Sequence, residues 1–163
     1  AAIQLQVEAA LDYDKLLDKL RGSEGEKNIR DQQNALITSL NLRLNGVSKK
    51  RTRLYEDYAE GLLDEEEYAF AKKSYDEQYA DLSRRLDEAV QRRSKFNEAM
   101  SVDNKWITLM KSVSTATRLT QDLVDESVEL VKVHEGGAVE LVMKYGDIYE
   151  LTIQSIKEVQ GAM

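Results

Sequence analysis

Carboxylate side chains crowd residues 56 to 67, a stretch with seven acids and no basic residue. Carboxylate oxygens are the ligands that calcium and magnesium take in proteins, so this cluster is a candidate divalent-cation site. The spacing differs from that of a calcium-binding loop, and acids also stabilise the first turn of a helix through its dipole. The pattern therefore favours a solvated, helix-capping acidic segment over a metal site. The acids are Glu56, Asp57, Glu60, Asp64, Glu65, Glu66 and Glu67.

The residue types that catalysis or a zinc site needs are scarce. The chain has one histidine, His134, and no cysteine, so it offers no thiolate, no disulfide and no set of nucleophile, base and orienting group. A zinc site would have to rely on carboxylates almost alone. We therefore expect no catalytic residue, no metal and no cofactor in this chain, and folding without zinc.

Basic residues form a run from Lys49 to Arg53 and a pair at Arg84 and Arg85. Clustered cations can bind the phosphates of a nucleic acid. The net charge of −7 argues against general nucleic-acid binding, so this chain alone should bind duplex DNA weakly and without sequence preference. Internal pairing with acids is the favoured role of the run, whereas the arginine pair is more ambiguous. The candidate contacts to a partner or to DNA are Lys49, Lys50, Arg51, Arg53, Arg84 and Arg85.

Two apolar stripes predict the elements that carry these side chains. One runs from Ile29 to Tyr58 in steps of three and four, and the other runs from Tyr68 to Met100 with heptad spacing. If the chain reverses at residues 61–63, the numbers of facing residues add to a constant, which predicts one antiparallel coiled-coil hairpin with arms of about 50 Å. The facing pairs are Tyr58 with Tyr68, Arg51 with Tyr75, Val47 with Tyr79, Leu44 with Leu82, Leu40 with Leu86 and Gln33 with Arg93. Leu36 and Leu54 complete the first stripe.

The predicted reversal holds apolar residues inside a polar stretch. Leu62 and Leu63 follow Gly61, and Asp64 with Glu67 forms a capping-box pattern for the returning helix. Two interpretations of the leucines stand open: they close the end of the hairpin core, or they contact a partner. The acids of two identical tips would repel each other. The expected partner surface is therefore the basic run of another hairpin or a separate regulator. The candidate interaction residues of the tip are Tyr58, Leu62, Leu63 and Tyr68.

The remaining elements are shorter. Alternation over residues 2–7 before a helical face predicts a strand leading into a helix, or one helix throughout, and residues 21–26 indicate a linker. Helices are expected over residues 106–113 and 120–127, and Gly46 marks either a close helix contact or a soft point in the first arm. A period of two then predicts an antiparallel β-meander packed on the N-terminal segment and the Trp106 helix. Its three strands are expected near residues 131–133, 139–145 and 149–153.

The expected fold is mainly α with a small β part: a long antiparallel coiled-coil hairpin projecting from a compact α+β base that contains the C-terminal β-meander. The base should comprise residues 1–25 and 101–163, and the hairpin residues 26–100 with its tip at 59–66. The sequence lacks a signal peptide and an 18-residue apolar run, which predicts a cytoplasmic protein without a membrane role. The start at Ala1 without methionine suggests a processed or excised piece.

Two segments resemble the C-terminal region of large serine recombinases, the integrases and transposases of phages and mobile elements. They are LYEDYAEGLLDEEEYAFAKKSYDEQYADL from Leu54 and RLTQDLVDESVELVKVHEGGAVELVMKYGDIYEL from Arg118. In that family a catalytic serine domain and a DNA-binding domain precede a zinc-ribbon domain, from which a coiled-coil hairpin emerges before the chain returns. The resemblance implies that this chain is the hairpin with the returning portion.

The family's serine nucleophile and zinc-ribbon cysteines have no counterpart in this chain, so neither catalysis nor metal binding carries over. What the resemblance implies is the hairpin's role: contacts with other recombinase subunits that permit or block synapsis of attachment sites, under control of a directionality factor. DNA would be bound by the full-length protein. The alternative is a free-standing coiled-coil adaptor or chaperone-like protein with no DNA role.

Overall fold

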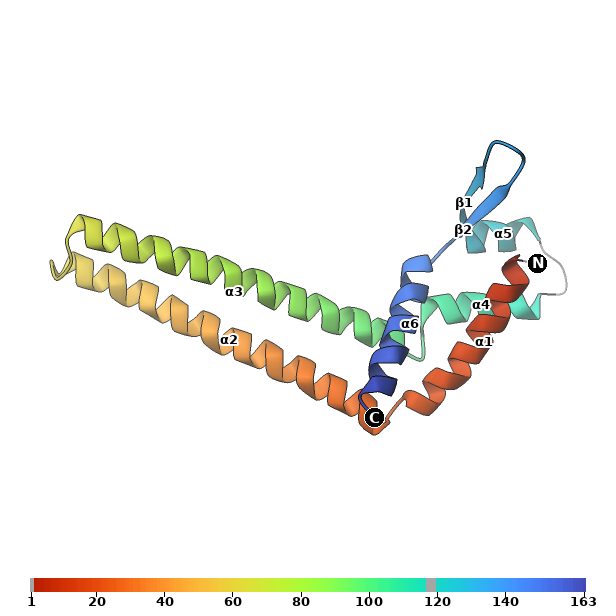
Figure 1. Cartoon of the computed structure of the whole chain (residues 1–163), viewed down its shortest axis with the longest axis horizontal. Coiled ribbons are helices and arrows are strands. Elements are labelled where there is room, and N and C mark those ends of the chain that lie inside the picture. Colours follow the sequence, from red (N-terminus) through yellow and green to blue (C-terminus); the bar gives the residue numbers. More distant parts are fainter. Residues whose placement is uncertain (1, 117–119) are drawn as a thin grey trace. The chain divides into compact units, whose positions relative to one another are not determined.

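The computed structural model describes residues 2–116 and 120–163, apart from the side chains of residues 2–6, Leu123 and Leu141. Arg118, which opens the second recombinase-like segment, thus lies outside the described residues. The elements in chain order are α1 (Ala2–Leu20), α2 (Glu24–Ala59), α3 (Glu65–Met100), α4 (Lys105–Thr115), α5 (Gln121–Ser127), β1 (Val128–Val133), β2 (Val139–Met143) and α6 (Gly146–Gly161) (Figure 1). The predicted class, mainly α with a small antiparallel β part, is confirmed.

The chain divides into two compact units, which are described separately. Residues 30–93 form the hairpin unit, and residues 1–29 with 94–163 form the second unit, here called the base. The base therefore includes the first turn and a half of α2 and the last two turns of α3. The boundaries expected from the sequence, at residues 25 and 101, lie at the ends of these helices instead.

Helices α2 and α3 lie antiparallel in the hairpin unit, and their apolar stripes meet (Figure 1). The register predicted from the stripes is confirmed at Tyr58 and Tyr68, whose rings stack with centroids 4.3 Å apart. Farther along, the guanidinium of Arg51 lies 4.8 Å from the ring centre of Tyr79. The buried side chains of the seam are Ile37, Leu40, Val47, Leu82 and Ala89, with Leu44, Tyr75, Tyr79 and Leu86 packed against them.

One member of the predicted stripe is wrong. Leu36 is 49% exposed, and its neighbour Ile37 takes the buried place opposite Ala89. Both choices continue a three-four spacing, so the stripe alone could not separate them. The predicted polar layer is only partly formed, because Arg93 donates to the Asn34 side chain at 3.1 Å while the Gln33 carbonyl oxygen is buried without a hydrogen-bond partner.

The reversal between the arms is built from two local motifs. Gly61 has φ 76°, and the amides of Gly61 and Leu62 donate to the carbonyls of Tyr58 and Asp57, which is the Schellman end of a helix. Two residues later the Asp64 carboxylate accepts from the Glu67 amide at 2.8 Å, and the Glu67 carboxylate accepts from the Asp64 amide at 3.1 Å. The predicted capping box is confirmed.

The base has a core made by helices. Trp106 on α4 packs between Tyr13 of α1 and Tyr149 of α6, with ring centroids 6.0 and 4.6 Å away. Asn104 caps α4 through the Ile107 amide and donates to the hydroxyl of Thr152, so its buried amide group is satisfied. The strands reach this core only at their inner ends. The buried apolar residues of the core are Ala10, Leu17, Leu20, Phe96, Met100, Trp106, Ile107, Met110, Met143, Ile148, Ile156 and Val159.

One sequence expectation for the base is corrected, and one open alternative is settled. The third strand of the meander, expected at residues 149–153, is part of helix α6, and the sheet has two strands. A longer stretch of sequence shows why this segment is a helix. Its buried residues recur with helical spacing: Ile148, Thr152, Ile156 and Val159. Of the two possibilities for the N-terminus, one helix throughout is correct, since α1 begins at Ala2.

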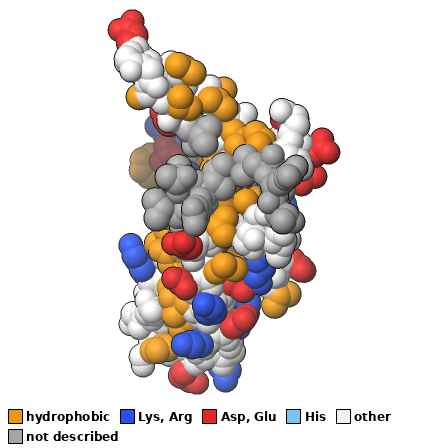
Figure 2. Space-filling view, turned by 90° about the vertical axis from the view of Figure 1, so that its right-hand side faces the viewer, with side chains coloured by type: hydrophobic (Ala, Val, Ile, Leu, Met, Phe, Trp, Pro, Cys, Tyr) orange, Lys and Arg blue, Asp and Glu red, His pale blue; other side chains and the backbone are white. Residues whose placement is uncertain are grey.

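The β1–β2 hairpin displays apolar side chains to solvent (Figure 2). Val131 and Val133 of β1 and Val139 of β2 share one face of the ladder, and each is at least half exposed. Leu130 is similarly exposed on the other face. The meander was expected to be covered by the Trp106 helix, but along the described part of the strands only Val128 and Met143 join the helical core.

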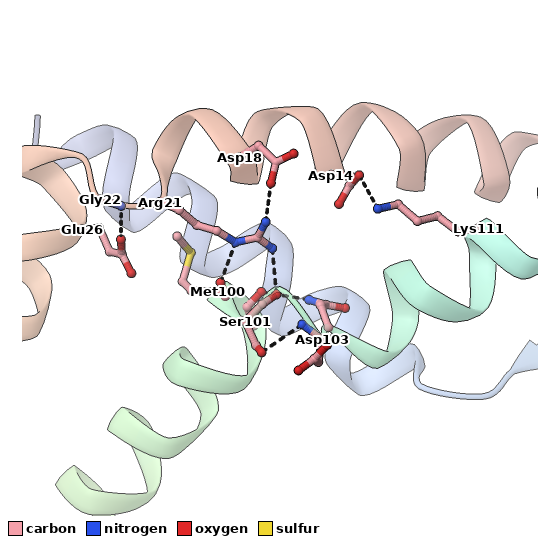
Figure 3. A network of polar contacts seen from close by, with 11 residues as sticks. Asp14, Asp18, Arg21, Gly22, Glu26, Met100, Ser101, Asp103 and Lys111 are labelled. Atoms are coloured by element: carbon pink, nitrogen blue, oxygen red, sulfur yellow. Dashed lines mark hydrogen bonds and ion pairs between the residues drawn. The ribbon is translucent and has the colours of Figure 1, made fainter.

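Arg21 ties the end of α1 to the end of α3 (Figure 3). Its Nε donates to the carbonyl of Met100 at 2.9 Å, and its Nη2 donates to the carbonyl of Ser101 at 2.7 Å. Its Nη1 forms an ion pair with the carboxylate of Asp18. Helix α3 has no basic residue in its own last turn. Arg21 therefore supplies both the donors and the positive charge that the C-terminus of α3 lacks.

Replacing Arg21 by Met should lower the free energy of unfolding by about 1–3 kcal/mol, because two part-buried carbonyls lose their donor while most of the apolar stem is kept. Lys15→Met, an exposed change on the same helix, should stay within about 0.5 kcal/mol of the parent. Urea unfolding followed by circular dichroism measures both. Equal effects of the two substitutions would contradict this role of Arg21.

Two glycines of α2 differ in their surroundings. At Gly25 a Cβ atom would collide with the carbonyl oxygen of Val159 and the side chain of Met163, so the absence of a side chain lets α6 approach. At Gly46 nothing lies within 4 Å of a Cβ position, which rules out the close helix contact considered for this residue.

Gly25→Ala should therefore lower the free energy of unfolding by about 1–3 kcal/mol through overpacking. Gly46→Ala should raise it by up to about 1 kcal/mol, since alanine favours the helix and meets no neighbour. Denaturant midpoints of the two variants test the pair. Stabilisation by Gly25→Ala would show that the α2–α6 contact is not as close as described.

Candidate interaction surface at the hairpin tip

The two leucines of the tip are neighbours in the sequence, but they differ in their exposure to solvent. Leu62 is the residue after the Schellman glycine and is 68% exposed, whereas Leu63 is half-buried. In a Schellman motif the residue after the glycine commonly packs back on the helix, and the exposure of Leu62 shows that this contact is slight here. Leu63 therefore fits a role in closing the hairpin end, and Leu62 is free to contact another molecule.

Two further exposed aromatic residues flank the tip and were missed in the sequence analysis. Phe70 on α3 is 81% exposed and Tyr55 on α2 is 62% exposed. Both lie off the apolar stripes, so a search for seam positions passes over them. The sequence does indicate their exposure, because a large apolar residue between the seam positions of a polar helix faces solvent. With Leu62 they give the tip three exposed apolar groups.

The acids of the tip act on the helix ends. Glu65, Glu66 and Glu67 occupy the first turn of α3, where their charge favours the helix dipole, and Glu67 completes the capping box. Over the residues that the structure describes, no three carboxylate or imidazole groups are placed to hold a metal ion. Four of the seven acids, Asp64 to Glu67, thus contribute to capping α3.

The basic run divides into paired and unpaired side chains. Arg51 forms an ion pair with Asp76 across the arms at 2.8 Å, and Lys72 shares the same carboxylate at 3.3 Å. Lys49, Lys50 and Arg53 are exposed, and none of them has an ion-pair partner among the described residues. The internal pairing favoured from the sequence therefore holds for Arg51 alone, and three cations remain available at the surface.

The second basic candidate pair is neutralised within its own helix. Arg84 bonds Asp81 and Glu88, each at 2.7 Å, and these hydrogen bonds, with Asp81 first, raise the pKa of the Arg84 guanidinium above its usual value. Arg85 lies 3.8 Å from Asp81. Acids one turn away on α3 thus already engage both arginines. They are weaker candidates for phosphate contacts than Lys49, Lys50 and Arg53.

The single histidine belongs to a surface ladder. His134 donates from Nε2 to Glu140 at 2.9 Å, and Lys132 approaches the same carboxylate at 3.3 Å. The His134 contact, followed by that of Lys132, lowers the pKa of Glu140 below its ordinary value. The three groups are exposed on the β-hairpin and join its two strands, so the arrangement stabilises strand pairing.

A shallow groove runs beside the tip between the two arms. It has a volume of about 470 Å³, and Tyr55 and Thr52 of α2 with Tyr68 and Lys72 of α3 form much of its wall. Arg51 and Asp76, which form an ion pair, also line it. The groove combines aromatic surface with two cations, Arg51 and Lys72, that share the carboxylate of Asp76.

No family model, curated protein or solved structure matches the chain. Within the described residues, no helix is long and apolar enough to cross a membrane. The features that remain for a functional argument are therefore the exposed apolar groups, the charges and the groove at the end of the hairpin unit.

Leu62→Ser should leave the melting temperature unchanged within error, because the side chain is already exposed. Leu63→Ser should lower the stability of the hairpin unit by roughly 1 kcal/mol, since it removes a half-buried leucine. Thermal unfolding of the two single variants, which carry the same chemical change at neighbouring positions, makes the comparison. A loss of stability with Leu62→Ser would assign both leucines to the core of the hairpin end.

Proposed function

We propose that this chain is a non-catalytic module of a large serine recombinase, in which the hairpin unit mediates contacts between recombinase subunits that control synapsis and directionality. The observation that carries the proposal is the tip, where Tyr55, Leu62 and Phe70 are exposed at the far end of two long helices. Each helix has 36 residues and spans about 54 Å, so the tip lies at one end of two long helices.

The size of the apolar surface suits a contact that forms and dissolves. Full burial of a leucine or phenylalanine side chain is worth about 1.5–3 kcal/mol, whereas association costs roughly 4–15 kcal/mol. Three such groups per tip support a weak contact between subunits that DNA already holds close together. A synaptic complex needs that behaviour, because the same subunits must later separate.

The remaining parts of the proposal follow from the resemblance. Catalysis and most of the DNA affinity reside in other parts of the recombinase, and this chain binds DNA weakly by itself. A directionality factor acts on the same hairpin, and the protein works in the cytoplasm on the DNA of a phage or mobile element. The unpaired Lys49, Lys50 and Arg53 are available for a protein partner or for phosphate groups.

The test is made in the complete gene product, whose upstream part should contain a serine recombinase domain. Replacing residues 30–93 by a short glycine-serine linker should leave binding to a single attachment site intact and abolish synapsis of two sites. Gel-shift and in vitro recombination assays measure the two steps. A full-length protein carrying Lys15→Met serves as the control with an intact hairpin.

Two results would contradict the proposal. Unimpaired synapsis without the hairpin would remove its role in subunit contacts. A complete gene product without a catalytic domain would instead identify a coiled-coil adaptor with no role in DNA recombination.

A further inference from the structure

The charges near the end of the hairpin unit are separated into two zones along its axis. The acidic tip, residues 56–67, carries seven negative charges and no positive charge. Immediately behind it lies a zone with six positive charges and two negative ones, Asp76 and Glu77, here called the basic collar. The collar comprises Lys49, Lys50, Arg51 and Arg53 of α2 and Lys72 and Lys73 of α3.

The confirmed register places both halves of the collar at the same level. Tyr58 stacks on Tyr68, and counting back along both arms from that pair brings Arg53 opposite Lys73. The collar is therefore a single basic zone that two distant segments build, and not the run of Lys49 to Arg53 alone. Four of its cations are unpaired within the described residues: Lys49, Lys50, Arg53 and Lys73.

This separation decides how two hairpins can meet. Two identical tips approaching head-on would bring seven negative charges against seven, which is repulsive. If the hairpins instead lie antiparallel and overlap at their ends, the acidic tip of each faces the basic collar of the other. The middle of the collar lies about eleven residues along the arms from the reversal, so the two hairpin ends must overlap by at least about 16 Å.

We propose that a second copy of this chain is the partner of the tip, docked as an antiparallel, two-fold symmetric overlap in which each acidic tip lies on the basic collar of the other copy. A two-fold contact uses the same patch on both subunits, and a patch with one acidic and one basic zone is complementary to itself in this arrangement. The inference rests on the proposed function and specifies the surface that it uses.

The groove beside the tip lies within the collar and gives Leu62 a place to bind. It is lined by Thr52, Tyr55 and Lys72, and its volume of about 470 Å³ exceeds that of one leucine side chain. Leu62 is exposed and is surrounded in sequence by Glu60 and Asp64, which the unpaired cations of the collar would attract. Leu62 of one copy inserted beside Tyr55 of the other covers the apolar groups of both.

The small size of the surface predicts the character of the association. Few apolar side chains are buried, so the whole chain should associate weakly and reversibly. The charged zones are exposed, so raising the salt concentration should weaken the association. These properties separate the overlap from an obligate dimer with a large apolar interface.

A charge-swap experiment tests the overlap with the whole 163-residue chain. The collar variant carries Lys49→Glu, Lys50→Glu, Arg53→Glu and Lys73→Glu, which leaves the ion pair of Arg51 untouched. The tip variant carries Glu56→Lys, Glu60→Lys, Glu65→Lys and Glu66→Lys, which leaves the capping box untouched. Circular dichroism checks that both remain folded, and sedimentation equilibrium measures their association.

The overlap predicts that each variant alone associates at least about tenfold more weakly than the parent, because like zones then face each other. An equimolar mixture should regain association, since the acidic tip and acidic collar of one variant match the basic collar and basic tip of the other. A control with Arg85→Glu and Lys95→Glu, outside both zones, should behave as the parent.

The other outcomes are equally decisive. A collar variant that associates like the parent would overturn the overlap while leaving hairpin contacts, and thus the proposed function, intact. Two weakened variants whose mixture stays monomeric would also overturn it. A parent chain that is monomeric at all concentrations would overturn both the overlap and direct contact between these chains.

Cross-linking gives a second measurement that does not alter charge. The chain has no cysteine, so Leu62→Cys and Thr52→Cys introduce the only thiols. Mild oxidation of a mixture of the two single variants should give the mixed disulfide dimer as the main product. Leu42→Cys, equally exposed but outside the groove, is the control partner for Leu62→Cys. A dominant dimer of Leu62→Cys with itself would indicate head-on contact and overturn the overlap.

Discussion

The register between α2 and α3 is the constraint on which the surface of the hairpin unit depends. It is set at the reversal, where the Schellman end at Gly61 and the capping box of Asp64 with Glu67 leave no freedom in the number of connecting residues. A shift by one residue would separate the rings of Tyr58 and Tyr68 and move Lys72 and Lys73 away from the level of Arg53. The turn therefore determines which charges lie side by side.

The sequence was most informative where a long periodic pattern and local chemistry agreed. The two arms, their register and the capping box followed from seam positions and from turn residues, because each of these signals is repeated or strictly local. The third strand failed because residues 149–153 alternate over too short a window. Tertiary packing on α1 and α4 favours the helix, because it buries Ile148, Thr152, Ile156 and Val159.

The candidate site was only partly predictable. The sequence identified the tip and both leucines, but not that Leu62 is exposed while Leu63 is half-buried, since that difference arises from the Schellman geometry. Tyr55 and Phe70 escaped a search directed at the seam. The pairing of Arg51 with Asp76, and the freedom of Lys49 and Lys50, depend on which face of α2 each occupies.

Four of the seven acids of the tip serve the fold. A helix that starts immediately after a tight reversal has unsatisfied amide groups at its N-terminus, and Asp64 and Glu65 to Glu67 are the residues that bind or stabilise them. A sharply turned hairpin thus acquires a negative end as a consequence of folding. A positive partner surface is then favoured, and the collar of a second copy is such a surface. The capping chemistry that closes the hairpin therefore also favours an offset contact over a head-on one.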